Sequence, residues 1–301
     1  MSAAGGGATG GPAGTPPPHV PDDPSGTTPP AVSDVASGAT PPGVPSSPPD
    51  GAFGRLSVGM HVHECRFAGG VAVLLDRPAW DPDAVELGAT DLGRVRVQAP
   101  AGPGKVVAVG LNYAAHAAEF DSETAAEPIL FLKPRTSLIG PGEAIVFPAR
   151  STRVDYEAEL ALVIGRRCRD VSPAEAAGYV AGYTCANDVT ARDLQALDGQ
   201  WTRSKSFDTF CPLGPWVVPD APPPEARVVA RLDGRVVQEG LVGDMLVSPL
   251  ELVAFVSGVM TLEPGDVVLT GTPPGVGPLA AGQTVTVEVG GVGRLISLVR
   301  G

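Results

Sequence analysis

The chain of 301 residues is long enough for one large domain or two smaller ones, and its net charge of −12 is strongly acidic. An acidic surface argues against nucleic acid or an anionic membrane as a partner, because both attract basic surfaces. No stretch approaches the length of about 18 apolar residues that a membrane-spanning helix needs, and the four cysteines lack C-x-x-C spacing, so we expect a cytoplasmic protein with reduced thiols.

The beginning of the chain differs in composition from the rest. The first 50 residues contain 13 Pro, 9 Gly and four Asp but no Lys or Arg. Such a segment buries too little apolar surface to offset the entropy of ordering it, so we predict a disordered tail over residues 1–52. A secretory signal and a mitochondrial presequence are both unexpected, because the segment has no basic start, no continuous apolar stretch and no Arg before Arg55.

The next part of the chain, residues 53–101, has an irregular pattern with short strand-like pieces such as 70–75. We interpret it as a small N-terminal β-rich domain. Two Pro and two Gly within residues 98–104 then predict a linker to a second domain over residues 102–301.

In this second domain, short apolar runs rich in Val, Leu and Ile predict buried strands. The expected strands are 105–111, 129–133, 158–164, 227–232, 235–239, 266–270, 284–289 and 294–299. Helices are predicted where Ser172 and Ser248 each precede a Pro and then a Glu, a combination typical of a helix start. Asp233-Gly234 predicts a tight hairpin. Strands outnumber helices without regular βαβ alternation, so we expect a mixed α+β, β-rich fold.

Two carboxylates stand at the start of one predicted strand. Glu157 and Glu159 are two positions apart, so on a strand both side chains point to the same face. Their mutual repulsion must be relieved by protonation, a cation or a metal, and oxygen ligands suit a hard ion such as Mg²⁺, Mn²⁺ or Ca²⁺. The alternative from the pair alone is a solvated strand start without a ligand.

A third carboxylate, Asp188, follows an apolar stretch at residues 179–186, where a strand ends and a short helix is expected to begin. Arg192 and Gln195 lie three positions apart, which places them on one face of that helix. A guanidinium that can make two parallel hydrogen bonds suits a carboxylate substrate. Further along the chain, Lys205 stands in a partly apolar context.

Six motifs taken together resemble the fumarylacetoacetate hydrolase superfamily over residues 105–301. They occur in the order of the family: V-G-L-N-Y-A-A-H-A-A-E, F-L-K-P, Y-E-A-E-L, N-D-V-T-A-R-D-L-Q, K-S-F-D and L-T-G-T-P-P-G-V-G. The wording of the motifs is most similar to that of the shorter bacterial members named 2-hydroxyhepta-2,4-diene-1,7-dioate isomerases, and it is also similar to the acylpyruvases. The resemblance implies a β-roll catalytic domain behind a small N-terminal β domain, and a homodimer.

The resemblance also implies roles for particular residues. Glu157, Glu159 and Asp188 match three metal-binding carboxylates, with Mg²⁺ or Mn²⁺ as the expected ion and Ca²⁺ as a further option. The residues that match substrate-binding positions are Arg192, Gln195, Gly271 and Thr272. The residues that match catalytic positions are Lys205, near the metal and substrate oxygens, and His116 with Glu119, on a segment that closes over ligand.

The residues support the pairing of His116 with Glu119. The two lie three positions apart in a short polar helical segment, and a carboxylate beside an imidazole raises its basicity and fixes its tautomer, as a general base requires. The alternative is a surface His with an acidic neighbour by chance. If His116 is not the base, Lys205 is the next candidate.

The implied function is a divalent-metal-dependent enzyme that acts on a small 2-oxo or 2-hydroxy-enol carboxylate or dicarboxylate. Carbon–carbon bond hydrolysis, keto–enol isomerisation and decarboxylation all pass through an enolate that a metal can stabilise, so these residues do not choose between them. The resemblance places the reaction in the breakdown of aromatic compounds. The alternative of another class is a catalytically silent protein that keeps the fold and binds metal or ligand.

Overall fold

A computed structural model of the chain describes residues 47–119 and 127–301. The predicted tail falls outside the described residues up to residue 46, and so does the part of the segment expected to close over ligand from residue 120 to about 124. The described chain begins with a turn, in which the Gly51 N–H donates to the Phe67 carbonyl at 2.9 Å and the Ala52 N–H to the Pro49 carbonyl at 3.1 Å. The domain boundaries predicted at 52 and 101 stay predictions.

The first strands form an antiparallel meander in the order β4-β3-β2-β1, with β5 paired to the other side of β1. Their bounds are β1 (Phe53–Val58), β2 (His61–Ala68), β3 (Val71–Leu75), β4 (Glu86–Asp91) and β5 (Arg96–Val97). Leu56, Cys65 and Phe67 are buried beneath the meander. The ring of Phe67 meets the edge of Trp216 at 6.1 Å between centroids, which ties the meander to the next strand of the sheet.

The same sheet continues from β1 through the strands that carry the site, in the order β14-β12-β11-β17-β6-β7. Their bounds are β14 (Cys211–Val218), β12 (Val180–Asn187), β11 (Ala158–Ile164), β17 (Val267–Leu269), β6 (Val106–Gly110) and β7 (Ile129–Lys133), with β8 (Leu138–Ile139) beside β14. Every residue of β11 and β14 is buried, because both faces of the sheet are covered. This explains why these strands have continuous apolar runs in the sequence.

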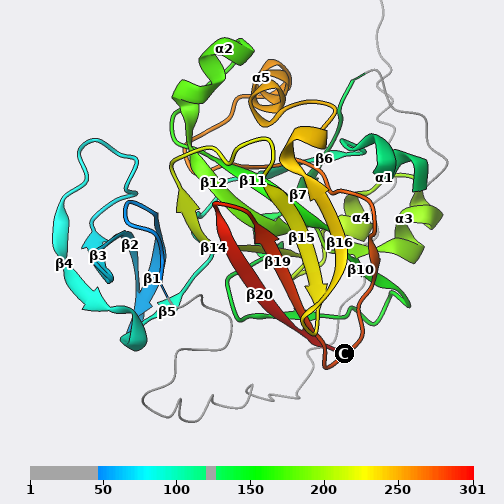
Figure 1. Ribbon diagram of the computed structural model, residues 1–301, viewed down its shortest axis with the longest axis horizontal. Coiled ribbons are helices and arrows are strands. Elements are labelled where there is room, and N and C mark those ends of the chain that lie inside the picture. Colours follow the sequence, from blue (N-terminus) through cyan, green and yellow to red (C-terminus); the bar gives the residue numbers. More distant parts are fainter. Residues whose placement is uncertain (1–46, 120–126) are drawn as a thin grey trace, which may run out of the picture. The chain divides into compact units, whose positions relative to one another are not determined.

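A second sheet has the strand order β16-β15-β19-β20-β9 and lies across β11, β12 and β14 (Figure 1). Its strands are β15 (Arg227–Leu232), β16 (Arg235–Leu241), β19 (Thr284–Val289), β20 (Gly293–Arg300) and β9 (Ala144–Val146). The hairpin predicted at Asp233-Gly234 joins β15 to β16, with φ of 49° and 83° at the two residues, as a tight turn with left-handed backbone requires.

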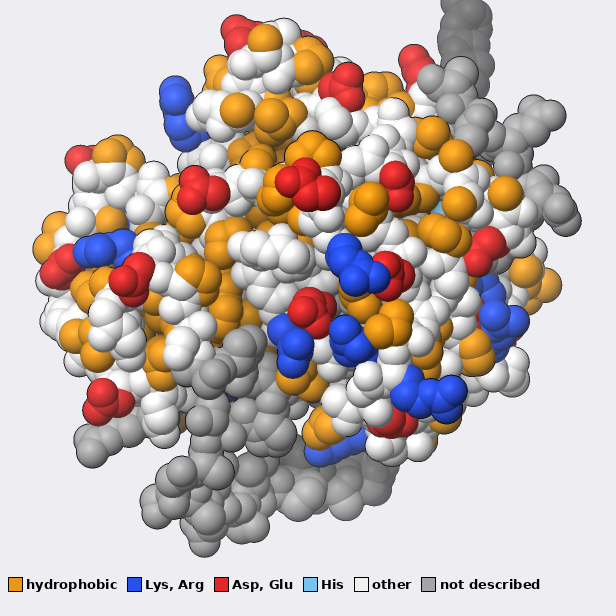
Figure 2. Space-filling view, in the orientation of Figure 1, with side chains coloured by type: hydrophobic (Ala, Val, Ile, Leu, Met, Phe, Trp, Pro, Cys, Tyr) orange, Lys and Arg blue, Asp and Glu red, His pale blue; other side chains and the backbone are white. Residues whose placement is uncertain are grey.

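Side chains of the second sheet alternate between core and solvent. Val285, Val287 and Val289 of β19 point into the core between the two sheets. On the solvent face, Glu288 forms ion pairs with Arg294 at 3.1 Å and with Arg231 at 3.6 Å. Figure 2 shows the result on this side of the molecule, where Lys and Arg side chains are interleaved with Asp and Glu.

The helices are short and stand at the edges of the sheets. They are α1 (Ala114–Glu119), α2 (Pro173–Ala176), α3 (Arg192–Asp198), α4 (Thr202–Lys205) and α5 (Pro249–Val259), with single 3₁₀ turns η1 (Leu92–Arg94), η2 (Arg135–Ser137), η3 (Ala177–Tyr179) and η4 (Val242–Asp244). Both helices predicted from Ser-Pro are present, and Glu175 and Glu251 reach back to the Ser172 and Ser248 N–H groups at 3.0 and 2.9 Å. None of the helices in the described residues is long and apolar enough to cross a membrane.

Side chains along β11 alternate between the two faces of the sheet. Leu160 and Leu162 belong to the core between the two sheets, whereas Ala161 and Val163 belong to a separate apolar cluster on the opposite face. Glu159 has the parity of this second group, so its side chain points to the opposite face. A small third sheet of β13 (Thr190–Ala191), β10 (Val154–Tyr156) and β18 (Gly277–Pro278) borders the same region.

Candidate metal centre

Three buried carboxylates meet at the end of β11. One oxygen from each of Glu157, Glu159 and Asp188 lies within 4.8 Å of the others, and each side chain is almost fully buried. Pairing of Ala158 with Asn187 brings β11 and β12 into register, so that the Asp188 N–H donates to the Glu157 carbonyl at 2.9 Å. Strand pairing thus joins positions that lie some thirty residues apart in the chain.

The backbone at Glu157 differs from the prediction of a single strand. β10 ends at Tyr156 and β11 begins at Ala158, so Glu157 stands at the break between them. Its backbone N–H donates to the side-chain oxygen of Asn187 at 2.9 Å, outside the regular ladder. The carboxylates of Glu157 and Glu159 nevertheless lie close together, as predicted, with oxygens within 4.8 Å of each other.

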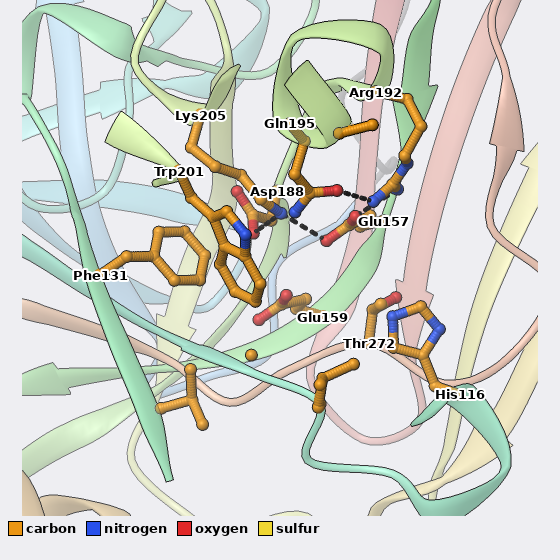
Figure 3. A pocket seen from close by; sticks show the side chains of 14 residues that line it. His116, Phe131, Glu157, Glu159, Asp188, Arg192, Gln195, Trp201, Lys205 and Thr272 are labelled. Atoms are coloured by element: carbon orange, nitrogen blue, oxygen red, sulfur yellow. Dashed lines mark hydrogen bonds and ion pairs between the residues drawn. The ribbon is translucent and has the colours of Figure 1, made fainter. Parts of the chain in front are cut away.

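Lys205 and Arg192 bind the carboxylates. The Lys205 ammonium lies 2.8 Å from Glu157 and 2.6 Å from Asp188 (Figure 3). The Arg192 guanidinium donates to Glu157 at 2.5 Å, and it also donates to the Gln195 side-chain oxygen at 2.6 Å. Arg192 and Gln195 therefore share one helix face as predicted, and the guanidinium is also a structural partner of a candidate metal ligand. Substrate contacts of both residues stay predictions.

Two further charged residues of the centre were missed by the sequence reasoning. Lys133, at the end of β7, donates to Asp188 at 2.5 Å and to the Val189 carbonyl at 3.2 Å with its side chain fully buried. Asp155, equally buried, accepts from Arg192 at 3.0 Å. The available signal for Lys133 was a lysine directly continuing an apolar run, since a buried ammonium needs an anionic partner.

The electrostatics of the two glutamates differ. Burial raises the pKa of Glu159, and the nearby charges of Asp188 and Glu157 raise this pKa further, well above its usual range. Burial would also raise the pKa of Glu157, but the positive charges of Lys205 and Arg192 outweigh it and hold this pKa below its usual range. Glu157 is therefore ionised within an ion-pair network, whereas ionised Glu159 calls for a further cation.

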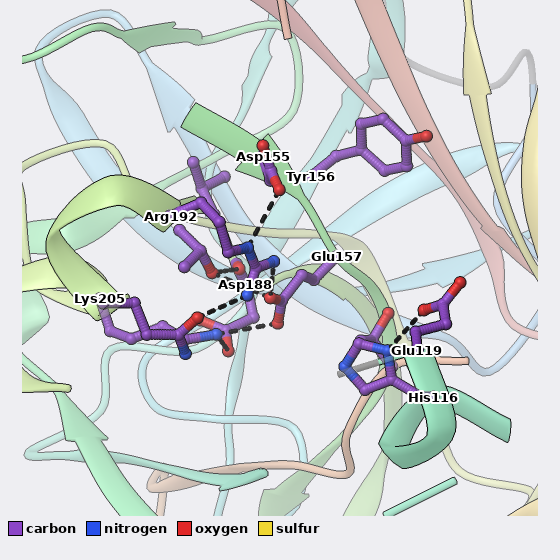
Figure 4. A network of polar contacts seen from close by, with 12 residues as sticks. His116, Glu119, Asp155, Tyr156, Glu157, Asp188, Arg192 and Lys205 are labelled. Atoms are coloured by element: carbon purple, nitrogen blue, oxygen red, sulfur yellow. Dashed lines mark hydrogen bonds and ion pairs between the residues drawn. The ribbon is translucent and has the colours of Figure 1, made fainter. Parts of the chain in front are cut away.

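His116 and Glu119 form the predicted pair on α1. The His116 Nδ1 atom lies 3.0 Å from a Glu119 carboxylate oxygen, and the imidazole is buried (Figure 4). The other Glu119 oxygen accepts from the Gly275 N–H at 2.7 Å, which anchors the carboxylate to the loop before β18. A carboxylate that accepts the Nδ1 proton leaves Nε2 as the basic nitrogen of the ring.

The turn at Gly271 and Thr272 holds the carboxylate centre together. The Gly271 N–H donates to Glu159 at 2.7 Å, and the Thr272 hydroxyl donates to the Ala158 carbonyl at 2.9 Å. Gly271 has a φ of 92°, and a Cβ there would lie 2.8 Å from the Asn112 side chain, so only glycine fits. The predicted contacts of Gly271 and Thr272 with substrate stay predictions, and these hydrogen bonds show a supporting role.

A cavity of about 310 Å³ opens onto the carboxylates. The residues that line it are Val109, Gly110, Leu111, His116, Phe131, Glu157, Glu159, Asp188, Arg192, Gln195, Ala196, Trp201, Lys205 and Thr272. In Figure 3 the rings of Phe131 and Trp201 lie on one side of the carboxylates, and His116 lies on the other. The cavity thus presents the carboxylate cluster, the imidazole and an aromatic wall to a single small molecule.

The donor set of this centre fits a hard divalent cation. All three candidate ligands are carboxylates, which Mg²⁺ and Mn²⁺ prefer, and their oxygens are close enough to share one ion. Lys205 neutralises part of the charge on Glu157 and Asp188, but among the described residues no ammonium or guanidinium forms an ion pair with Glu159. Repulsion acting on buried Glu159 is what a bound metal would relieve.

Comparison with known proteins gives the same assignment. The model of the fumarylacetoacetate (FAA) hydrolase C-terminal domain matches residues 105–300, about two thirds of the chain. The chain belongs to the fumarylacetoacetate hydrolase family. It is 52% identical over 204 residues to an uncharacterised protein from Archaeoglobus fulgidus, covering 68% of this chain and 82% of the relative.

Two solved structures extend the comparison. A 2-hydroxyhepta-2,4-diene-1,7-dioate isomerase from Mycobacterium marinum is 40% identical, with a TM-score of 0.76, covering 83% of this chain and 98% of the other. A fumarylpyruvate hydrolase from Pseudomonas aeruginosa, solved with Mn²⁺ and pyruvate, is 32% identical, with a TM-score of 0.62 and coverage of 65% and 89%. The predicted family and the β-rich α+β fold are confirmed.

Proposed function

We propose that the protein is a divalent-metal-dependent enzyme that acts on a small 2-oxo or 2-hydroxy-enol carboxylate, either by hydrolysing a carbon–carbon bond or by isomerising the enol. The observation that carries the proposal is one cavity that holds three buried carboxylates together with a His–Glu pair. When Mg²⁺ or Mn²⁺ is bound by the carboxylates, it polarises the 2-oxo group of the substrate and stabilises the negative charge that develops there.

His116 supplies the base in this proposal. Glu119 binds Nδ1, which makes Nε2 the basic nitrogen of the ring, and this nitrogen takes a proton from the substrate or from water. Hydrolysis and isomerisation both need such a base. Decarboxylation of a 2-oxo diacid such as oxaloacetate does not, because loss of the carboxylate β to the 2-oxo group as CO₂ forms the enolate directly. The pair therefore favours the first two reactions over decarboxylation.

Two charged residues, Arg192 and Lys205, position the substrate and the carboxylates. Arg192 lines the cavity and donates hydrogen bonds to Glu157 and to Gln195. In the proposal, Arg192 and Gln195 bind the carboxylate of the substrate. Lys205 keeps Glu157 and Asp188 together and contributes a positive charge beside the reacting group. The aromatic rings of Phe131 and Trp201 exclude water from one side of the cavity.

The test is a turnover assay with Mg²⁺ or Mn²⁺ against acetylpyruvate, fumarylpyruvate, oxaloacetate and 2-hydroxyhepta-2,4-diene-1,7-dioate. We expect metal-dependent turnover of at least one of acetylpyruvate, fumarylpyruvate and 2-hydroxyhepta-2,4-diene-1,7-dioate. This turnover should be lost in Glu159→Gln. Metal binding by calorimetry without turnover on any substrate would instead support a catalytically silent binding protein. Turnover of oxaloacetate alone would show a decarboxylase.

Three wider features belong to the same proposal. A homodimer and a role in the breakdown of aromatic compounds follow from the family resemblance, and a cytoplasmic location follows from the composition and the cysteine spacing of the sequence. The name of the Mycobacterium marinum relative, an isomerase of an acyclic hydroxy-diene diacid, is compatible with the last of these. Light scattering after size-exclusion chromatography tests the dimer directly.

A further inference from the structure

We propose that Tyr156 is a positioning residue for the pair of His116 and Glu119. Its buried hydroxyl holds the loop before β18, so that the Gly275 N–H binds Glu119 in the orientation that His116 needs. The proposal rests on the proposed function, because it concerns the base that this function assigns to His116. Tyr156 is not among the residues that line the cavity, so it acts through other groups.

The orientation of the Glu119 carboxylate depends on the loop. One oxygen lies 3.0 Å from His116 Nδ1, and the other accepts from the Gly275 N–H at 2.7 Å. The side chain of Glu119 is 35% exposed and stands at the end of a helix of six residues. A long side chain at the surface keeps its rotamer freedom unless hydrogen bonds restrict it. The Gly275 N–H is therefore the contact that selects the orientation in which Glu119 accepts from His116.

The backbone of Gly275 has to be held in place by its neighbours. Its φ is 99°, and a Cβ there would lie 3.0 Å from the Val237 carbonyl, so the position requires a glycine, whose backbone is flexible. The start of the loop is held by the Gln238 amide, which donates to the Pro273 carbonyl at 2.6 Å. The Tyr156 hydroxyl donates to the Gly275 carbonyl at 3.0 Å. The bond from Tyr156 is thus the one that holds Gly275 itself from the side of the core.

The Tyr156 ring is fixed, and the loop lies directly on it. Tyr156 is 4% exposed and belongs to the core between the two sheets. It pairs with Gly277 between β10 and β18, and a Cβ at Gly277 would lie 2.9 Å from the phenol oxygen. A buried tyrosine hydroxyl needs a hydrogen-bond partner, and the Gly275 carbonyl supplies it. Burial and register together fix the place at which the hydroxyl meets the loop.

Tyr156 and Glu157 are neighbours in the chain and serve opposite parts of the site. Glu157 is a candidate metal ligand bound by Lys205, whereas Tyr156 reaches the base through Gly275 and Glu119. Figure 4 shows the Tyr156 ring turned away from Lys205. One short stretch of backbone therefore sets the base relative to the metal centre, and small errors in such geometry lower the rate of a reaction.

Tyr156→Phe tests the proposal, because it removes the hydroxyl and keeps the buried ring. With Mg²⁺ and the substrate of the four-compound panel that is turned over, kcat should fall by about threefold to tenfold, the range that one ordinary hydrogen bond controls. KM and the Mn²⁺ affinity by calorimetry should change by less than about twofold, since the cavity lining is intact. Tyr183→Phe, at another buried tyrosine outside the cavity lining, is the matched control and should leave kcat unchanged. An unchanged kcat in Tyr156→Phe overturns the proposal.

A double-mutant cycle separates positioning from a general structural role. Glu119→Ala removes the group through which Tyr156 acts, so the addition of Tyr156→Phe to this variant should change kcat by less than about twofold. If the same fall in kcat is found with and without Glu119, Tyr156 acts by another route and the proposal is wrong.

The tautomer of His116 gives a readout that needs no substrate. The chain contains four histidines (His19, His61, His63 and His116), so the ring signals of His116 are identified by their loss in His116→Ala. At about pH 8.5, where an ordinary imidazole is neutral, nitrogen-15 NMR of the metal-free protein should show mainly the Nδ1–H form. Tyr156→Phe and Glu119→Ala should both raise the share of the Nε2–H form.

The two readouts distinguish the two proposals. The same tautomer distribution in Tyr156→Phe and in the unsubstituted protein overturns the positioning role of Tyr156, whatever the turnover. A changed distribution in a protein that turns over none of the four compounds supports the link from Tyr156 to His116 and contradicts the proposed function instead.

Discussion

The ammonium of Lys133 donates a 2.5 Å hydrogen bond to Asp188, and neither side chain has more than 1% of its surface exposed. Lys133 does not line the cavity, so it acts on the candidate metal ligand from behind. Its positive charge offsets the negative charge of the Asp188 carboxylate in a buried position. A bound metal and Lys133 would both offset the negative charge of Asp188. A change at Lys133 should therefore affect both the stability of the protein and the effect of the metal on that stability.

Lys133→Met should lower the free energy of unfolding of the metal-free protein by about 3–5 kcal/mol, as removal of one partner of a buried ion pair does. Saturating Mn²⁺ should recover more stability in this variant than in the unsubstituted protein, because the metal replaces the lost positive charge. Denaturant unfolding with and without Mn²⁺ measures both effects. Lys105→Met, which breaks the partly buried pair with Asp266 outside the cavity lining, is the control and should show no extra recovery.

Identical substitutions at the two neighbouring glutamates should have opposite effects on the metal-free protein. Glu159→Gln removes a carboxylate that burial and the charges of Asp188 and Glu157 disfavour, so stability should rise. Glu157→Gln removes the partner of Lys205 and Arg192, so stability should fall. Both should weaken Mn²⁺ binding by more than about 100-fold, beyond the range for a supporting contact. The same sign of stability change in both variants would contradict the assignment of charges.

His116→Ala should reduce turnover by about 10²–10⁴-fold, the range for loss of a general base. Mn²⁺ affinity by calorimetry should not change, because the three carboxylates remain. The acid limb of the pH–rate profile should disappear with the imidazole, and Glu119→Gln should do less harm, since it removes only the anchor of Nδ1. Full turnover with an unchanged acid limb would show that another group, with Lys205 as the next candidate, is the base.

Glu64 in β2 should make stability depend on pH far from the metal centre. Burial raises its pKa from 4.5 to about 7, against a smaller opposing effect of Arg55. The folded state therefore holds a proton that the unfolded state releases, so the free energy of unfolding should fall as pH rises from about 4.5 to about 7. Glu64→Gln should remove this loss, worth about 2–3 kcal/mol above pH 7, whereas exposed Glu86→Gln should not. Parallel stability–pH curves for Glu64→Gln and the unsubstituted protein would refute the shift.

A chain that begins at Ser47 should keep full turnover and full metal affinity. The removed residues have a Pro- and Gly-rich composition without apolar periodicity. The turn that follows is kept, including the Asp50 carboxylate that accepts from the Gly69 N–H at 2.8 Å. Steady-state kinetics of the two chains gives the comparison, and a large loss of turnover in the shorter one would show that the tail contributes to the catalytic domain.

Signals that act within a few residues could be predicted from the sequence. The Ser172 and Ser248 helix starts, the Asp233-Gly234 turn and the apolar strands are local, because a cap or a turn residue acts on its own backbone. The pairs Glu157 with Glu159 and His116 with Glu119 were predictable for the same reason, since the period of a strand or helix sets which neighbours share a face. Family motifs then joined the pairs into one site.

Contacts that depend on strand pairing and packing were decided only by the tertiary structure. Lys133 and Asp188 lie 55 residues apart, and Arg192 and Asp155 lie 37 apart, so nothing in the local sequence shows that they are partners. The break at Glu157 and the closure of Trp201 over Gly110 also require neighbouring strands to be in place. Local periodicity fixes the direction of a side chain, but its charge environment comes from segments brought together by burial of the core.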